Sequence, residues 1–170
     1  SAKGFCSLDG LFLVKDVGFN YWTKGKGKKR DGNSIGDRIF YSGKRQHPKD
    51  IPFLKGRDLN KWYFTSPANY LKYNYRNFLN ERVDTFRFSA DLLESVPKII
   101  YRQTATTIIA TIDNNKNYLD KTVHLIVPRT SWEKYPALFL LGLLNSSLFS
   151  YLYTHISQET EGRIFAQVKT

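Results

Sequence analysis

A cluster of cations near the start of the chain is the strongest chemical signal in the sequence. Such a run cannot pack in an apolar core, and its self-repulsion falls when phosphates neutralise it and release their condensed counterions. Glycines at alternate positions indicate a surface loop. The sequence therefore predicts a nucleic-acid contact, with a solvated charge run as the alternative. Five cations in seven residues form this basic loop, with no acidic residue among them: Lys24, Lys26, Lys28, Lys29 and Arg30.

Two further polar segments follow strand-like runs and are candidates for contacts with base edges. In the first, Lys55 and Arg57 flank a glycine, and Arg57 can grip a phosphate or a guanine edge with two hydrogen bonds. In the second, Arg102 suits guanine, Gln103 suits adenine, and Thr104 suits a phosphate. The ordinary alternatives are a locally stabilised turn in the first segment and plain strand-end polarity in the second.

The composition of the whole chain agrees with a polyanionic partner. The net charge is +11, the pI is about 9.7, and residues 1–60 hold 13 Lys and Arg against 6 Asp and Glu. This balance favours nucleic acid first and an anionic membrane surface second. A length of 170 residues with 41% hydrophobic content predicts one domain over 1–170. No apolar run approaches 18 residues, so no membrane span is expected.

No enzymatic or metal centre emerges from the sequence. The single cysteine, Cys6, cannot form an internal disulfide, which fits a cytoplasmic protein. The three histidines have no zinc-type spacing, and Walker A, nucleophile-elbow, Asn/Asp-Pro-Pro-Tyr/Phe and glycine-rich S-adenosylmethionine motifs are absent. We therefore predict no catalytic residue, metal ligand or cofactor site in this stretch. Because the chain has no Met and starts at Ser1, we expect it to be a piece of a larger protein.

The elements that must position these side chains are mainly strands. Alternation and β-branched runs predict strands over 10–15, 37–41, 51–54, 98–103, 108–112 and 118–127, with an edge strand or extended loop over 69–75 and an extended piece over 163–170. In the strand 118–127 the period of two places His124 on the solvent or ligand face.

Helical signals are few and come late. Ser89 suits the N-cap of a short helix that stops before Pro97, and Pro136 suits the first turn of one long helix to about Ile156. The first half of the long helix is apolar all round, which predicts burial against the sheet. The polar run from Asn145 to Ser147 is expected to cap neighbouring backbone. The fold class is therefore α+β and β-rich, with a twisted mixed or antiparallel sheet and one long C-terminal helix.

Three segments in a fixed order add a resemblance to these observations: Pro52–Leu59, Pro97–Gln103 and Leu138–Leu148. Their order, over roughly residues 50–170, resembles the TaqI-like C-terminal specificity domain, the target recognition domain of bacterial restriction-modification adenine-specific DNA methyltransferases. The resemblance implies a relative of the target recognition domains of type I specificity subunits, whose loops enter the major groove. It also implies an N-terminal methyltransferase domain in the same polypeptide, binding S-adenosylmethionine, in a type II enzyme with or without a fused endonuclease. No catalytic residue is carried over.

The leading hypothesis is sequence-specific recognition of double-stranded DNA, with the basic loop on the phosphates and Arg57, Arg102 and Gln103 on base edges. One alternative is an RNA or single-strand binder that uses exposed aromatics such as Tyr70, Tyr73 and Tyr75. A second alternative is an assembly module that contacts a partner subunit.

Overall fold

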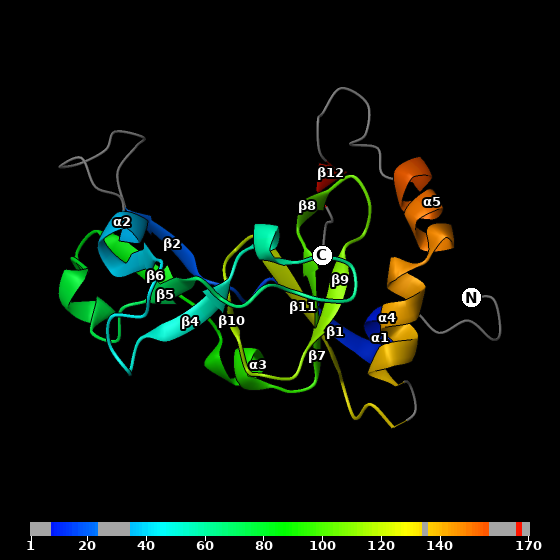
Figure 1. Ribbon diagram of the computed structural model, residues 1–170, viewed down its shortest axis with the longest axis horizontal. Helices are drawn as coiled ribbons and strands as arrows, with labels where there is room; N and C mark the ends of the chain where they lie inside the picture. The colour runs from blue at the N-terminus through cyan, green and yellow to red at the C-terminus, as the bar shows by residue number, and fades with distance from the viewer. Residues whose placement is uncertain (1–7, 24–34, 134–135, 157–165, 168–170) are drawn as a thin grey trace.

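The computed structural model describes residues 8–23, 35–133, 136–156 and 166–167 (Figure 1). Over these residues strands and short helices are mixed, which confirms the α+β class. The strands are β1 (Phe12–Lys15), β2 (Asn20–Thr23), β3 (Phe40–Ser42), β4 (Ile51–Leu54), β5 (Asn69–Leu71), β6 (Asp84–Arg87), β7 (Lys98–Arg102), β8 (Thr104–Ala105), β9 (Ala110–Asp113), β10 (Tyr118–Leu119), β11 (Val123–Pro128) and β12 (Ala166–Gln167). The helices are α1 (Leu8–Leu11), α2 (Ile35–Ile39), α3 (Ala90–Glu94), α4 (Ala137–Asn145) and α5 (Ser147–Ile156), with 3₁₀ turns η1 (Gly56–Asp58) and η2 (Tyr75–Phe78).

The central sheet is antiparallel and has the order β1-β11-β7-β9. Its two middle strands are runs of apolar, largely β-branched side chains, which suit a pleated and buried surface. In their register Ile100 lies opposite Leu125 and Ile99 opposite Ile126. Because successive side chains point to opposite faces, the continuous burial of these strands means that both faces of the sheet are covered.

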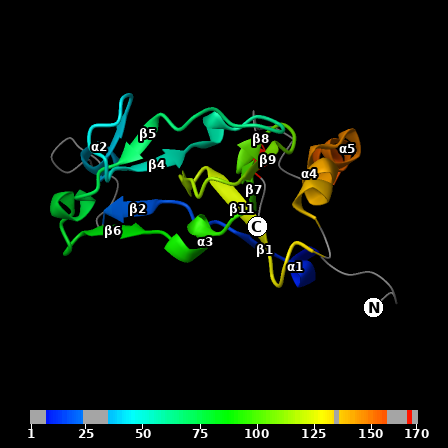
Figure 2. The same cartoon turned by 60° about the horizontal axis from the view of Figure 1, so that its bottom comes forward.

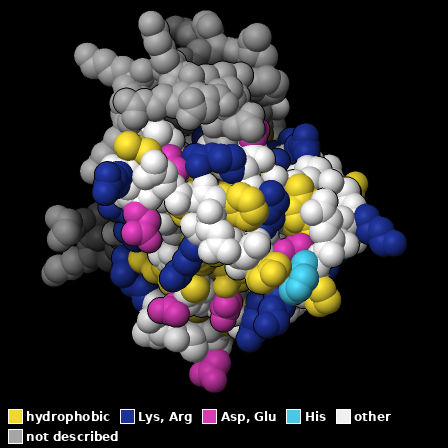
Figure 3. All heavy atoms as spheres, turned by 90° about the vertical axis from the view of Figure 1, so that its left-hand side faces the viewer, with side chains coloured by type: hydrophobic (Ala, Val, Ile, Leu, Met, Phe, Trp, Pro, Cys, Tyr) yellow, Lys and Arg dark blue, Asp and Glu magenta, His cyan; other side chains and the backbone are white. Residues whose placement is uncertain are grey.

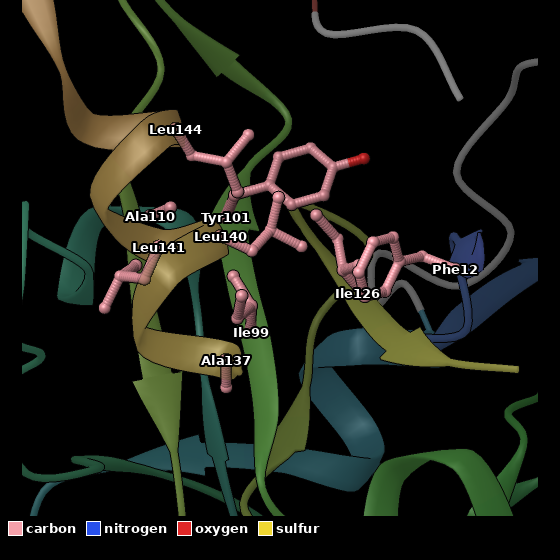
Figure 4. Packing of buried hydrophobic residues seen from close by; sticks show 9 residues of the cluster. All are labelled: Phe12, Ile99, Tyr101, Ala110, Ile126, Ala137, Leu140, Leu141 and Leu144. Carbon is pink, nitrogen blue, oxygen red and sulfur yellow. The ribbon is translucent and has the colours of Figure 1, made fainter. Parts of the chain in front are cut away.

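Helix α4 covers one face of the central sheet (Figure 4). Leu140, Leu141 and Leu144 of α4 pack there with Ile99 and other side chains of the sheet. The end of the helix is fixed by Asn145, whose side-chain oxygen accepts from the backbone N–H of Ala110 (3.1 Å) and whose amide donates to the Ala110 carbonyl (2.8 Å). This bond pair confirms that Asn145 serves the neighbouring backbone.

The opposite face of the central sheet packs on a second sheet and on α3. Leu125 and Ile100 meet Leu54 of β4, Leu119 of β10 and Leu93 of α3 in one buried cluster. The second sheet has the order β10-β4-β5-β3, in which only the β10–β4 pair is parallel. Figure 2 shows the two β-rich parts of the molecule from below.

An aromatic cluster holds the second sheet to the β2–β6 ribbon, at the left in Figure 1. Phe19 is fully buried at its centre, with ring centroids of Phe40, Phe53, Phe86 and Phe88 between 5.1 and 5.4 Å away. Stacked, tilted and edge-on pairs of this kind add about 0.5–1.5 kcal/mol each beyond their buried area. Phe19 therefore anchors β2, the strand that leads into the basic loop.

An ion pair is buried where β7 begins. Nζ of Lys98 lies 2.7 Å from Oδ2 of Asp113, both side chains are fully buried, and Nζ also donates to the Leu93 carbonyl (2.6 Å). The Asp113 carboxylate accepts from the backbone N–H groups of Asn115 (2.8 Å) and Asn117 (2.9 Å). Burial lowers the pKa of Lys98, although Asp113 favours the charged form. The pair ties the α3–β7 connection to the β9–β10 turn.

The predicted strand 37–41 is wrong in its first half, where the structure has α2. Ile35 and Ile39 are four residues apart and both enter the aromatic cluster, so the helical period decides the local structure. The segment 69–75 is neither an edge strand nor a loop throughout. Its first three residues form β5, which lies between β4 and β3, and its last residue begins η2.

The predicted strand 118–127 is two strands in two sheets. β10 pairs with β4, β11 pairs with β7, and a turn over 120–122 separates them. The placement of His124 on a solvent face is therefore wrong, since its side chain lies in a strand covered on both faces and is 3% exposed. Its Nδ1 is 3.4 Å from the Tyr101 hydroxyl, and burial lowers the pKa of His124.

The predicted long helix is broken at Ser146, where α4 and α5 bend by 56°. The Ser146 hydroxyl donates to the Leu143 carbonyl (2.7 Å) and accepts from the Phe149 N–H (3.1 Å), so it ends one helix and starts the next. The prediction that the first half of this helix is buried is also wrong for one side of α4, where Leu138 and Phe139 are 69% and 60% exposed.

Over the described residues no single helix is long and apolar enough to cross a membrane; only α4 and α5 taken as one bent pair reach the required length and composition. The remaining expected elements are found with small shifts. The strand expected over 108–112 is β9, α3 follows Ser89, and the expected extended piece 163–170 contains β12, paired with β8.

Asp113→Ala tests the buried ion pair. The change leaves the Lys98 ammonium buried without its counter-charge, so we expect the free energy of unfolding to fall by about 3–5 kcal/mol. Urea denaturation measures this loss. Asn114→Ala, on the same turn but with an exposed side chain, is the control and is expected to change it by less than about 0.5 kcal/mol. Equal effects of the two changes would show that the pair does not stabilise the fold.

Candidate nucleic-acid interface

The η1 turn is held from within by a carboxylate. Oδ2 of Asp58 accepts from the Lys55 N–H (2.8 Å), and the Leu59 N–H donates to the Gly56 carbonyl (3.1 Å). The Arg57 side chain is 71% exposed, and its Nε lies 3.9 Å from Oδ1 of Asp58. A pair at this distance and exposure contributes little, so the guanidinium of Arg57 is available to a ligand.

Gly56 is required for a close approach of two backbones. Its N–H donates to the Thr122 hydroxyl (2.9 Å), and a Cβ at this position would lie 3.1 Å from the Thr122 carbonyl oxygen. A side chain here would push the turn over 120–122 away from η1. The glycine therefore allows η1 to lie directly against the β10–β11 turn.

Arg102, at the end of β7, is bonded to the backbone of the η1 segment. Its Nε donates to the Leu59 carbonyl (3.0 Å), its Nη2 donates to the same oxygen, and Nη2 also reaches the Arg57 carbonyl at 3.5 Å. Hydrogen bonds from a charged donor are among the stronger ones in proteins. The guanidinium of Arg102 thus joins the central sheet to the turn that carries Arg57.

The next two residues of the chain complete one surface. The Gln103 N–H donates to the Thr122 carbonyl (3.0 Å), and its side chain is half-buried. Thr104 is exposed on β8, which lies with β12 at the upper end of the central sheet in Figure 1. The structure therefore brings together the two polar segments that the sequence indicates for base contacts, one around Arg57 and one at residues 102–104. We call this the η1 surface: residues 55–58, 102–104 and 120–122.

The η1 surface also contains Lys121, a cation that sequence reasoning missed, beside the predicted Lys55. Lys121 is exposed, with Nζ 5.0 Å from the centre of the Tyr21 ring, and Nζ of Lys55 lies 5.6 Å from the Phe53 ring. Burial raises the pKa of Asp120, while Lys55 and Lys121 act to lower it. The polar run Asp-Lys-Thr inside an otherwise apolar stretch was the sequence signal for this turn.

The basic loop, Lys24 to Arg30, lies outside the described residues. Its flanks are described, and Asp84 connects them. Oδ1 of Asp84 accepts from the Thr23 hydroxyl (2.8 Å) at the end of β2, and Oδ2 pairs with Nη2 of Arg38 (2.8 Å) in α2. Burial acts to raise the pKa of Asp84, but hydrogen bonds from the Asn80 N–H, Arg38 and Thr23 outweigh it and hold the pKa below its ordinary value.

The tyrosines proposed for a single-strand binder do not form one platform. Tyr70 stacks on Tyr41 at 5.3 Å, Tyr73 stacks on His47 at 4.0 Å, and Tyr75 packs on the aromatic cluster. Figure 3 shows the end of the molecule that lies at the left in Figure 1, where Lys and Arg side chains surround hydrophobic ones. Each of the three tyrosines thus has its own aromatic partner in the described part of the chain.

Within the part of the chain that the structure describes, no group of three or more His, Cys, Asp or Glu side chains could hold a metal ion. The geometry offers something else: an exposed guanidinium on a rigid turn, next to polar strand ends and lysines. This arrangement suits hydrogen bonds to phosphates and base edges.

Comparison with known proteins identifies a family. Residues 51–170 match the model of a family described as the TaqI-like C-terminal specificity domain. No curated protein matches the chain. The matched region includes all of the η1 surface and leaves the basic loop outside it.

Paired alanine substitutions separate the roles of the two arginines. Arg102→Ala removes the donors to the Leu59 carbonyl, and we expect the free energy of unfolding to fall by about 1–3 kcal/mol. Arg57→Ala, two residues before that carbonyl, is the matched control and is expected to change it by less than about 0.5 kcal/mol, because its side chain is exposed. Thermal or urea unfolding of both variants measures these changes in the free energy of unfolding. If Arg102→Ala is as stable as Arg57→Ala, Arg102 does not hold the η1 turn.

Proposed function

The chain belongs to the TaqI-like C-terminal specificity domain family, and from this premise we propose that it recognises a specific sequence in double-stranded DNA. The family's role is DNA recognition in restriction-modification methyltransferases, and a specificity domain is generally non-catalytic. This membership is the observation that carries the proposal. Methyl transfer then belongs to another domain, which we place N-terminal in the same polypeptide of a bacterial, cytoplasmic type II adenine methyltransferase that binds S-adenosylmethionine.

The η1 surface supports base reading by Arg57 and Gln103. The turn that carries Arg57 is fixed by Asp58, by Gly56 on Thr122 and by Arg102, so little ordering of the backbone remains to be done on binding. The exposed guanidinium that this turn presents can donate two parallel bonds to guanine, and the Gln103 amide can pair with adenine.

Arg102 has a narrower role than the sequence predicts. Its Nε and Nη2 already donate to the Leu59 carbonyl, which leaves Nη1 as the guanidinium nitrogen that no described hydrogen bond uses. We therefore propose that Arg102 makes one single-donor contact to a base or phosphate rather than a bidentate pair.

The phosphate contacts are proposed for the basic loop and for the lysines of the η1 surface. Lys55 and Lys121 lie beside Arg57 or on the adjoining turn, and Thr104 offers a hydroxyl at the exposed end of β8. Contacts of this kind position the protein on the duplex without reading sequence, and each neutralised phosphate adds to the salt dependence of binding.

A salt titration tests this function. Fluorescence anisotropy with a labelled 20-base-pair duplex is expected to show binding that falls linearly on a log–log plot against salt. Changing Lys28, Lys29 and Arg30 to Ala should reduce that slope by about 2–3 units, since up to three phosphate contacts are lost. Lys116→Ala is the control because Lys116 lies far from the proposed contact. It is on the turn after Asp113, which pairs with Lys98 at the end of β7 opposite to Arg102. It should leave the slope unchanged.

Competing nucleic acids separate the alternatives. A single strand of the same length should compete less well than the duplex. Stronger competition by the single strand would replace the proposal with the single-strand reading. Salt-insensitive DNA binding together with tight protein association would replace it with the assembly role.

A further inference from the structure

A hairpin that begins at the end of η1 carries two exposed aromatic side chains that the proposed function does not use. Trp62 is 56% exposed and Tyr63 is 60% exposed, at the tip of the hairpin. Leu59 and Phe64 form the antiparallel bridge at its base, and Phe64 packs against the buried cluster under the central sheet. The tip is therefore continuous with the segment that Arg102 holds.

The hairpin is fixed on several sides. The Asn60 N–H donates to the Tyr63 carbonyl (2.8 Å), which closes the tip, and the Trp62 N–H donates to the Ala110 carbonyl of β9 (3.1 Å). Nζ of Lys61 donates to the Asn145 carbonyl (3.2 Å) and the Ser150 hydroxyl (3.3 Å), at the junction of α4 and α5. The backbone of the tip is thus bonded to the sheet, and its lysine to the helices, so the aromatic rings are presented from a rigid support.

The backbone of Trp62 has a conformation that side chains disfavour. Its φ is +78°, in the left-handed region, where a bulky residue is rare and strained. Burial of the ring does not offset this strain, since the residue is 56% exposed to solvent. Neither local preference nor core packing therefore accounts for a tryptophan here, whereas contact with a ligand would.

We propose that Trp62 contacts bound DNA through its indole ring, which stacks on the face of a nucleobase, with Tyr63 beside it. This inference rests on the proposed function and assigns a contact that the family match does not provide. Every base has a π-face, so an aromatic ring can stack on an unstacked base or a widened base step without reading its identity.

The charges near the tip favour a nucleic acid over an apolar protein partner. Residues 55–63 contain Lys55, Arg57 and Lys61 against one acid, Asp58, whose carboxylate accepts from the Lys55 N–H and from the Asn69 side chain. An exposed ring flanked by cations matches a base flanked by phosphates. It is also the pattern of stacking sites in proteins that bind unpaired strands.

The test uses Trp62→Ala, Trp62→Phe and, as a matched exposed aromatic, Tyr151→Ala on α5, where the side chain is 59% exposed. The probe is a 20-base-pair duplex enriched by the unaltered chain from a randomised pool, labelled with 2-aminopurine. Loss of one stacked base corresponds to about a 5- to 150-fold weaker affinity, so Trp62→Ala should weaken binding within this range. The salt slope should stay the same because no phosphate contact is lost. Trp62→Phe and Tyr151→Ala should keep most of the affinity.

Trp62→Gly is the control that separates loss of binding from loss of folding. Glycine adopts φ near +78° without strain, so the thermal midpoint of Trp62→Gly should equal or exceed that of the unaltered chain while the affinity falls as in Trp62→Ala. The 2-aminopurine signal on binding should also change with both variants.

Two results would overturn the inference, and they differ in what else they reject. If the unaltered chain enriches a duplex and Trp62→Ala binds it with equal affinity and an equal 2-aminopurine signal, base stacking by Trp62 is rejected while the proposed function stands. If the unaltered chain enriches no duplex at all, both are rejected.

Discussion

The hydrogen bonds from the Arg102 guanidinium to the Leu59 carbonyl determine how this molecule presents its surface. Leu59 ends the η1 segment and starts the hairpin of Trp62, and Arg102 is the last residue of the buried strand β7. One side chain thus joins a buried strand of the central sheet to both exposed features, the η1 turn and the hairpin tip. Because the central sheet is covered on both faces, the position of Arg102 is set by the core and is transmitted to the turn.

Strand β7 has a cation at each end, and the two differ in burial and in partners. Lys98 at its start is fully buried and neutralised by Asp113, so it contributes to the fold and nothing to the surface charge. Arg102 at its end is half-buried, and its Nε and Nη2 donate to backbone carbonyls of the η1 segment. The strand therefore separates a structural end, which fixes the sheet to α3 and the β9–β10 turn, from an end that we propose for recognition.

Much of the fold could be predicted from sequence where local pattern and tertiary packing agree. The strands at 51–54 and 98–102 and the helix after Ser89 follow their residue types directly. Prediction failed where one continuous run of sequence is divided between two sheets. Residues 118–127 alternate like one strand, but a turn over 120–122 divides them, and a period of two does not show to which sheet each half belongs. His124 was misplaced because a period of two also does not show that both faces of β11 are covered.

The candidate site was predictable residue by residue but not as an arrangement. The sequence indicates Arg57 and Arg102 as polar side chains at the ends of strands, yet it does not show that one arginine holds the turn of the other. Thr122 and Lys121 join them only because Gly56 permits a contact between residues far apart in the chain. Trp62 gave no sequence signal, since exposure and a positive φ belong to the folded chain.

Amide hydrogen exchange with and without an enriched duplex is the most direct measurement of where DNA binds. The proposed contact covers the η1 surface and the adjoining hairpin tip, with the basic loop on the phosphates. Protection on adding duplex is therefore expected in residues 24–30, 55–63, 102–104 and 120–122. Protection confined to the exposed side of α4 and α5, or to the β3–β5 pair, would contradict it.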